Sequence, residues 1–207
     1  MSILFLKVIR NLFKEVEKMQ KRIGSDIKTS RFTHKSKSPA YIDIGVISMP
    51  TMQAYNRRKA VQYAKKWAYG RNPAYYDFSE LGGDCTNFIS QCLYAGSGVM
   101  NDTPEVGWYY KSLTARSPSW TGVEFLYRFL VTNNTRGPFA QETEEGEMEI
   151  GDVIQLGNGE RFYHSLLVTG TENGLYVAAH SFNAYMRPLV SYSYDRIRFL
   201  HIAGVYI

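Results

Sequence analysis

Cysteine is scarce in this chain, which has only two, Cys85 and Cys92, among 207 residues. Two cysteines cannot build the disulfide framework of a small secreted domain. If both lie on one helix, the helical rise separates them by roughly 10 Å, which is beyond the reach of a disulfide. No Cys and His spacing typical of zinc sites occurs, so we expect neither a structural metal nor another cofactor.

Long hydrophobic runs are also missing. The apolar stretch near the N-terminus is interrupted by Lys7 and Arg10 and leads to no small-residue cleavage site, so it does not predict a signal peptide. It is also too short and too charged to span a bilayer. The expected localisation is therefore cytoplasmic or peripheral to a membrane, with the cell wall as the alternative if the chain is exported by another route.

Residues 1–24 instead predict a basic amphipathic helix. Their apolar residues recur at helical spacing, and most of the lysines fall on other faces. This helix would pack on its own domain or on a partner subunit, or residues 1–22 would lie on an anionic membrane surface. An unrecognised export signal is a third interpretation. Residues 25–54 are rich in Ser, Thr, Lys and Gly and predict a polar linker with a short strand around residues 42–47.

The net charge of +5 conceals two regions of opposite sign. Residues 1–71 carry 16 Lys and Arg against 4 Asp and Glu, a charge of +12, whereas residues 72–207 carry 8 against 15, a charge of −7. A chain that is basic throughout would indicate a nucleic-acid partner. Because the basic residues belong to the N-terminal third and no motif of base or phosphate recognition occurs, we expect no specific nucleic acid.

Residues 55–207 have the pattern of an α+β domain. Apolar residues recur at helical spacing in residues 55–70 and 121–133, which predicts helices. After an acidic loop come short runs rich in β-branched and aromatic residues, namely DVIQL, YHSLLVTG, LYVAAHSF and IRFLHIAGVYI. Helices first and strands afterwards indicate helices packed on an antiparallel sheet.

The stretch GGDCTNFISQC places Cys85 directly after two glycines and an aspartate. Gly82 and Gly83 permit a sharp turn, and Asp84 is a preferred residue type at a helix N-cap. Cys85 is therefore expected in the first turn of a helix, where unpaired N–H groups and the helix dipole favour a thiolate. This placement indicates a nucleophile, whereas Cys92, two turns later on the apolar face, is expected in the core.

A cysteine nucleophile needs a base, and the chain has four histidines. His164 begins one strand of a predicted hairpin, and His180 ends the partner strand. His34 lies in the predicted linker, and His201 lies on a late strand as a core or edge residue. His164 and His180 are therefore the candidates for a catalytic role.

The length of the hairpin loop decides which residue meets His164. A five-residue loop, residues 170–174, would pair His164 directly with His180. A two-residue Asn-Gly turn would instead place Asn183 opposite His164 and His180 on the other face. The spacing leaves both registers open, and each supplies a polar partner for His164.

Several motifs of residues 55–207 resemble, in order, the bacterial putative amidase domain family, a papain-like group related to the NlpC-type peptidoglycan endopeptidases. They are YNRRKAVQYAKKWA, RNPAYYDF, GGDCTNFISQCLYAG, GDVIQL, YHSLLVTG and AAHSFNAYMRPL. The resemblance implies a papain-like fold, in which a helical half with the nucleophile helix packs on a C-terminal antiparallel sheet. It implies Cys85 as nucleophile, His164 as base and His180 as the group that orients the base. It also places Tyr75 where related peptidases have a tyrosine near the nucleophile.

Together these residues predict a cysteine-dependent hydrolase of amide or peptide bonds, and the resemblance implies peptidoglycan stem peptides as a substrate class. The thiol would form a thioester acyl-enzyme, and N–H groups at the helix start would form an oxyanion hole. The aromatic residues Trp108 and Trp120 would wall the cleft or pack in the core. The alternative function is a catalytically inactive papain-like binding module, against which the joint presence of Cys85, His164 and His180 argues.

Overall fold

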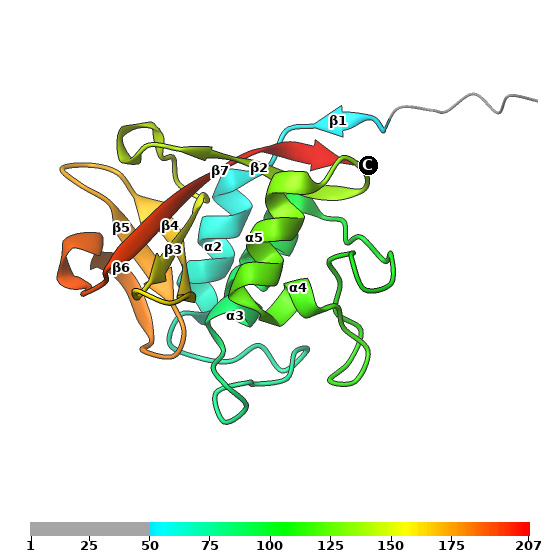
Figure 1. Cartoon of the computed structure of the whole chain (residues 1–207), viewed down its shortest axis with the longest axis horizontal. Coiled ribbons are helices and arrows are strands. Elements are labelled where there is room, and N and C mark those ends of the chain that lie inside the picture. Colours follow the sequence, from blue (N-terminus) through cyan, green and yellow to red (C-terminus); the bar gives the residue numbers. More distant parts are fainter. Residues whose placement is uncertain (1–49) are drawn as a thin grey trace, which may run out of the picture. The chain divides into compact units, whose positions relative to one another are not determined.

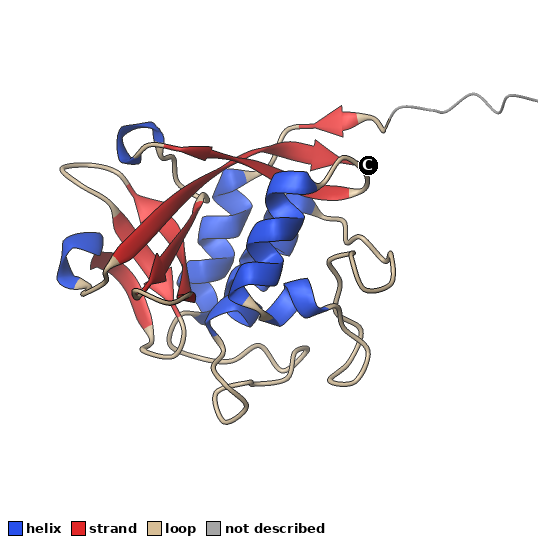
Figure 2. Cartoon of the chain, viewed as in Figure 1, coloured by secondary structure: helices blue, strands red, loops and turns tan. Residues whose placement is uncertain are grey.

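The computed structural model describes residues 50–207, in which N-terminal helices pack on a C-terminal antiparallel sheet (Figure 1, Figure 2). The predicted α+β class is confirmed at this level. The predicted helix of residues 1–24 and most of the predicted linker, residues 25–54, lie outside the described residues. Among residues 50–207, no helix is long and apolar enough to cross a membrane.

The helices of the described chain come mainly before the sheet. They are α2 (Arg57–Trp67), α3 (Cys85–Ser97), α4 (Pro118–Thr121) and α5 (Val123–Thr132). The start of α2 is capped by Asn56, whose side-chain oxygen accepts a hydrogen bond from the backbone N–H of Lys59 at 3.0 Å. The spacing of apolar residues predicted α2, α3 and α5. It did not predict α4, a single turn that begins at a proline.

The strands form one antiparallel sheet in the order β1-β7-β3-β4-β5-β6, and β2 also pairs with β7. The strands are β1 (Met52–Gln53), β2 (Gly137–Thr143), β3 (Val153–Gly157), β4 (Phe162–Gly170), β5 (Tyr176–Ala179), β6 (Ala184–Pro188) and β7 (Arg196–Tyr206). Two short 3₁₀ turns, η1 (Glu145–Glu147) and η2 (Leu189–Ser191), lie between strands. The β-rich runs predicted β3, β4, β5 and β7. The pattern did not predict β2 and β6, each of which contains a proline.

The strands at the centre of the sheet are buried on both faces. On one face α2, α3 and α5 all contact β4, and the larger core lies between these helices and the sheet. Leu167 belongs to this core, whereas its neighbour Val168 belongs to a second cluster on the opposite face, as strand alternation requires. Trp108 and Trp120 are fully buried in the larger core, so they pack there and do not wall a cleft.

Candidate active site

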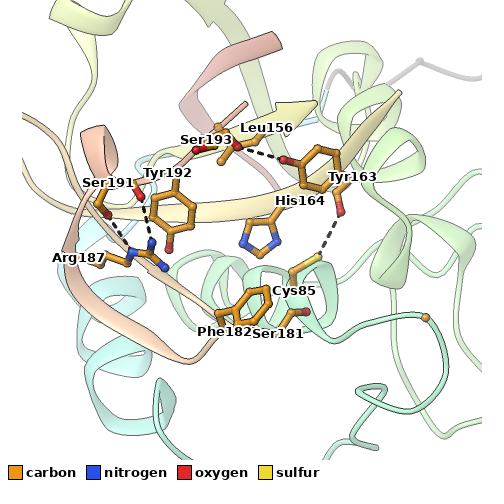
Figure 3. Close-up of a pocket in the computed structure, with 11 residues that line it drawn as sticks. Cys85, Leu156, Tyr163, His164, Ser181, Phe182, Arg187, Ser191, Tyr192 and Ser193 are labelled. Carbon is orange, nitrogen blue, oxygen red and sulfur yellow. Dashed lines mark hydrogen bonds between the residues drawn. The ribbon is translucent and has the colours of Figure 1, made fainter. Parts of the chain in front are cut away.

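A cavity of about 390 Å³ lies where the start of α3 meets β4 (Figure 3). Cys85 lines it from α3, His164 from β4 and Arg187 from β6. The lining is completed by Gly82, Leu156, Tyr163, Ser181, Phe182, Ser191, Tyr192 and Ser193. Figure 3 shows the thiol of Cys85 and the ring of His164 facing the same space. The structure therefore brings together two of the three predicted site residues.

Gly82 and Gly83 form the turn that leads into α3. Both have a positive φ, +97° and +110°, at which a residue with a side chain is strained. A side chain at Gly82 would have no neighbour within 4 Å, whereas the Cβ of one at Gly83 would lie 3.4 Å from Oγ of Ser181. The glycine pair thus allows the sharp turn and also leaves the approach to the thiol open.

Cys85 is 7% exposed, and its Sγ lies 3.9 Å from the carbonyl oxygen of Tyr163 and 3.8 Å from Oγ1 of Thr86. Burial raises the pKa of the Cys85 thiol above its usual value. Hydrogen bonds from Ser165 and Thr86 oppose this shift, and the charge of Asp84 adds to it. Burial therefore opposes the thiolate that the helix start is predicted to favour.

His164 is 8% exposed and pairs in register with Leu156 of β3. Burial lowers the pKa of its ring to about 4, and the positive charge of Arg187 adds to the decrease. The imidazole is therefore neutral at neutral pH and able to accept a proton. Burial thus favours the neutral forms of both side chains, a thiol at Cys85 and an imidazole at His164.

The predicted pairing of His180 with His164 is wrong. β4 and β5 pair Leu167 with Ala178, and continuing this register would place Ser181 opposite His164. A bulge near the end of β4 shifts the pairing, so neither predicted register occurs. A change of one residue relative to the predicted five-residue loop sends His180 to the opposite face of the sheet.

His180 instead connects the start of α3 to α2. Its Nδ1 lies 2.6 Å from Oδ2 of Asp84, and its Nε2 lies 2.9 Å from the carbonyl oxygen of Trp67. The ring stacks on Phe88 with 3.8 Å between the ring centres. Because His180 and Asp84 are almost completely buried, this contact holds the residue that precedes Cys85.

Asn183, the other predicted partner of His164, also lies elsewhere. Its Oδ1 accepts a hydrogen bond from Nη1 of Arg71 at 3.2 Å, and it does not line the cavity. Within residues 50–207 the ring of His164 has aromatic neighbours, Tyr163 and Tyr192, but no hydrogen-bond partner. No side chain of the described part of the chain therefore orients the ring as either register predicted.

Asp84 occupies the predicted N-cap position of α3, but its side chain does not cap the helix. Its Oδ1 accepts hydrogen bonds from the backbone N–H of Phe78 at 3.0 Å and from Nδ2 of Asn87 at 2.8 Å. Its Oδ2 faces His180. The carboxylate therefore leaves the first N–H groups of α3 to other acceptors.

Buried polar side chains fix α3 against the sheet. Oγ1 of Thr86 lies 3.1 Å from Oγ of Ser165, and Nε2 of Gln155 donates to the same oxygen at 3.2 Å. Thr86 follows Cys85 and Ser165 follows His164, so this contact sets the relative position of the two cavity residues. No motif predicted it, and the one signal was a pair of polar residues, Gln155 and Ser165, within otherwise apolar strands.

The remaining candidates lie away from the cavity. Cys92 is fully buried in the core, as predicted, and Tyr75 packs in an aromatic cluster outside the cavity. Nδ1 of His201 lies 3.0 Å from Oδ2 of Asp152, and His34 lies outside the described residues. In residues 50–207, no group of three His, Cys, Asp or Glu side chains is placed to hold a metal ion.

An α+β domain with a thiol and an imidazole in one cavity defines a candidate active site of the kind expected for amide hydrolysis. Residues 54–203 match the putative amidase domain, and the chain belongs to that family. It is also 39% identical over 141 residues to the uncharacterized protein YhbB of Bacillus subtilis (strain 168). The match covers 64% of this chain and 43% of YhbB, so the chain spans less than half of that relative. No solved structure matches the chain.

Proposed function

We propose that the protein is a papain-like cysteine amidase or peptidase in which Cys85 is the nucleophile and His164 the base. The observation that carries this proposal is that the first residue of α3 and a buried histidine of β4 line one cavity. Membership of the putative amidase domain family supports amide hydrolysis as the reaction. The substrate is a peptide or amide, and peptidoglycan stem peptides are the first class to test.

The proposed reaction starts from the neutral pair. As Sγ of Cys85 attacks the amide carbon, its proton moves to a ring nitrogen of His164 and a tetrahedral intermediate forms. The imidazolium then donates this proton to the leaving nitrogen, the C–N bond breaks, and a thioester remains on Cys85. Water that loses a proton to His164 attacks the thioester. The imidazolium then returns this proton to the departing Sγ as the acid is released, which restores the thiol and the neutral imidazole.

The start of α3 supplies the donors for the oxyanion. Because the side chain of Asp84 turns towards His180 and does not cap the helix, the N–H groups of the first turn, including that of Cys85, remain for the negative oxygen of the intermediate. In this proposal His180 does not orient His164. It acts as a positioning residue that holds Asp84, and through it the start of α3.

Digestion of purified peptidoglycan by the full chain tests the proposal. Mass spectrometry should detect new peptide fragments with the wild type and none with Cys85→Ala. Cys92→Ala is the matched control, because Cys92 lies in the core and its loss should reduce stability while activity remains. Release of the same fragments by Cys85→Ala would show that Cys85 is not the nucleophile.

An inactive binding module is the second candidate, and one observation favours it. The raised pKa of Cys85 and the lowered pKa of His164 oppose the ion pair that activates other cysteine nucleophiles. Iodoacetamide separates the two candidates at neutral pH. An active nucleophile predicts much faster labelling of Cys85 than of Cys92, whereas equal and slow labelling favours the binding module.

A further inference from the structure

One wall of the cavity carries a cation without an acidic partner. Arg187, the fourth residue of β6, lines the cavity together with Cys85 and His164. Within the described part of the chain no carboxylate forms an ion pair with its guanidinium, and the residues that line the cavity include no Asp or Glu. The cavity therefore presents a net positive charge to whatever enters it.

The protein holds this guanidinium in one orientation. Its Nε donates to Oγ of Ser191 at 2.8 Å, and its Nη2 donates to the carbonyl oxygen of Ser191 at 3.1 Å. Cζ lies 4.0 Å from the ring centre of Tyr192. These contacts leave Nη1 of Arg187 without a hydrogen-bond partner among residues 50–207, and Figure 3 shows the guanidinium directed towards the side of the cavity on which His164 lies. A guanidinium fixed in this way is pre-organised for a planar carboxylate.

The backbone before Arg187 contributes to this orientation. Met186 has a positive φ of 56°, which residues other than glycine rarely adopt. The pairing of β5 with β6 is also irregular, with a register shift between Val177 and Ala179. Such irregularities redirect side chains next to functional sites. A strained residue is maintained only where the surrounding structure demands it, and here it precedes the unpaired cation.

We infer that Arg187 binds a carboxylate, and that the substrate is an amide or peptide with a carboxylate group close to the bond that is cleaved. The inference rests on the proposed function and specifies its substrate class. The carboxylate would be the C-terminal carboxylate of a peptide or an acidic side chain. In both cases it would bind the edge of the guanidinium that carries Nη1.

A carboxylate at Arg187 also affects the proposed proton transfer. The charge of Arg187 opposes protonation of His164, and the reaction passes through the imidazolium. A bound carboxylate offsets that charge, so an anionic substrate makes it easier for His164 to take the proton of Cys85. A neutral amide leaves the charge of Arg187 unopposed, and it should therefore react more slowly as well as bind less well.

Iodoacetate and iodoacetamide test the carboxylate site without knowledge of the substrate. They have nearly the same size, both lose iodide to an attacking thiolate, and they differ in charge. The rate constant for iodoacetate at Cys85 is divided by that for iodoacetamide. In this ratio the thiolate fraction cancels, so the ratio reports how well the cavity accepts a carboxylate. In the full chain this ratio should exceed that of N-acetylcysteine amide. It should fall about three- to tenfold in Arg187→Gln, as expected for the loss of one nearby charge.

Two further variants control this measurement. Arg187→Lys keeps the charge but not the planar fork, so its ratio should lie between those of the wild type and Arg187→Gln. It also serves as the comparison if thermal unfolding shows that Arg187→Gln is destabilised. Arg58→Gln removes the same charge from an exposed position of α2 and should leave the ratio unchanged.

The outcomes separate this inference from the proposed function. If iodoacetamide still labels Cys85 rapidly and Arg187→Gln does not change the ratio, the carboxylate site is wrong and the nucleophile stands. If neither reagent labels Cys85, both proposals are wrong.

Protection of Cys85 from iodoacetamide distinguishes the two sources of the carboxylate. Protection by acetyl-Ala-Ala indicates a C-terminal carboxylate, and protection by acetyl-glutamate α-amide, which retains only the side-chain acid, indicates a side chain. Acetyl-Ala-Ala amide is the neutral control, and it should protect less than the better of the two acids. Equal protection by all three probes would contradict a carboxylate site.

Discussion

His164 lies on β4 and His180 directly follows β5, but the two histidines have opposite environments. The ring of His164 faces the cavity, has no hydrogen-bond partner within residues 50–207 and has its pKa lowered to about 4. The ring of His180 faces the helices and has an acceptor at each nitrogen. A histidine must exchange its proton to act as a base, so the one without such partners suits catalysis. The one with both nitrogens engaged suits a structural role.

The start of α3 shows the same division between two consecutive residues. Cys85 directs its sulfur into the cavity, whereas Asp84 directs its carboxylate to His180. The proposed nucleophile therefore lies next to a buried charge that raises the pKa of its thiol, and His180 lies on the far side of that charge. The two groups with different roles are therefore consecutive residues at the start of α3. In the same way, a shift of one residue in the pairing of β4 with β5 decides which face of the sheet His180 occupies.

The largest expected effect is on activity, at His164. His164→Gln should lower kcat by about 10²- to 10⁴-fold, because general acid–base catalysis is lost. Its thermal midpoint should remain close to that of the wild type, because the ring makes no hydrogen bond within the described chain. Peptide release from peptidoglycan and thermal unfolding measure the two quantities. If His180→Gln were equally inactive and fully stable, the division of roles between the two histidines would be wrong.

The next largest effect is on stability, at His180. His180→Ala should lower the free energy of unfolding by about 3–5 kcal/mol, because it removes a buried ring that stacks on Phe88 together with its 2.6 Å contact to the carboxylate of Asp84. Urea unfolding measures this loss, and residual activity should exceed that of His164→Ala. The double variant with Asp84→Asn is the control, and it should cost less than the two single changes together, since they remove one interaction. Additive losses would show that the two residues do not act as a pair.

Much of this comparison could be predicted from residue order. The glycine pair before Cys85 predicted the turn and the helix start, and the position of His164 on a β-rich run made it a candidate for the base. These features depend on local conformation, which short motifs determine. The role of His180 could not be predicted, because it depends on a bulge near the end of β4. The pattern of apolar residues does not indicate this bulge.

The pKa values could not be predicted from the motif either. The helix dipole at Cys85 is a local property, whereas the burial that raises the pKa of its thiol depends on the packing of α3 against β4. The sequence also did not predict Arg187 as a site residue. It belongs to a short strand that ends in a proline, and only the folded chain places it in the cavity with His164.

A smaller effect is expected on the pH dependence of stability. The folded-state pKa of His164 is about 4, below its ordinary value of 6.5, so between these values the unfolded chain binds a proton that the folded protein does not. Stability should therefore be fully present above pH 6.5 and should fall by up to about 3 kcal/mol as the pH drops towards 4.

Urea unfolding of the wild type and His164→Gln across this range isolates the contribution of His164. Other titrating groups are common to both proteins, so the difference between the two curves reports His164. The variant should show a shallower loss of stability as the pH falls. Parallel curves would mean that His164 is not held as a buried neutral ring, and the contrast with His180 would lose its basis.

The smallest effect is expected at Asn183, which the short-turn register would have placed opposite His164. Its side chain is exposed and accepts one hydrogen bond from Arg71, so Asn183→Ala should cost at most about 0.5–1.5 kcal/mol. Because Asn183 does not reach the cavity, peptide release should be unaffected, and His180→Ala measured in parallel should be the more damaging change. If Asn183→Ala instead lowered kcat as much as His164→Gln at equal stability, the working enzyme would use the short-turn register. Asn183 would then orient the base, and the shifted pairing of β4 with β5 would not be the one that supports catalysis.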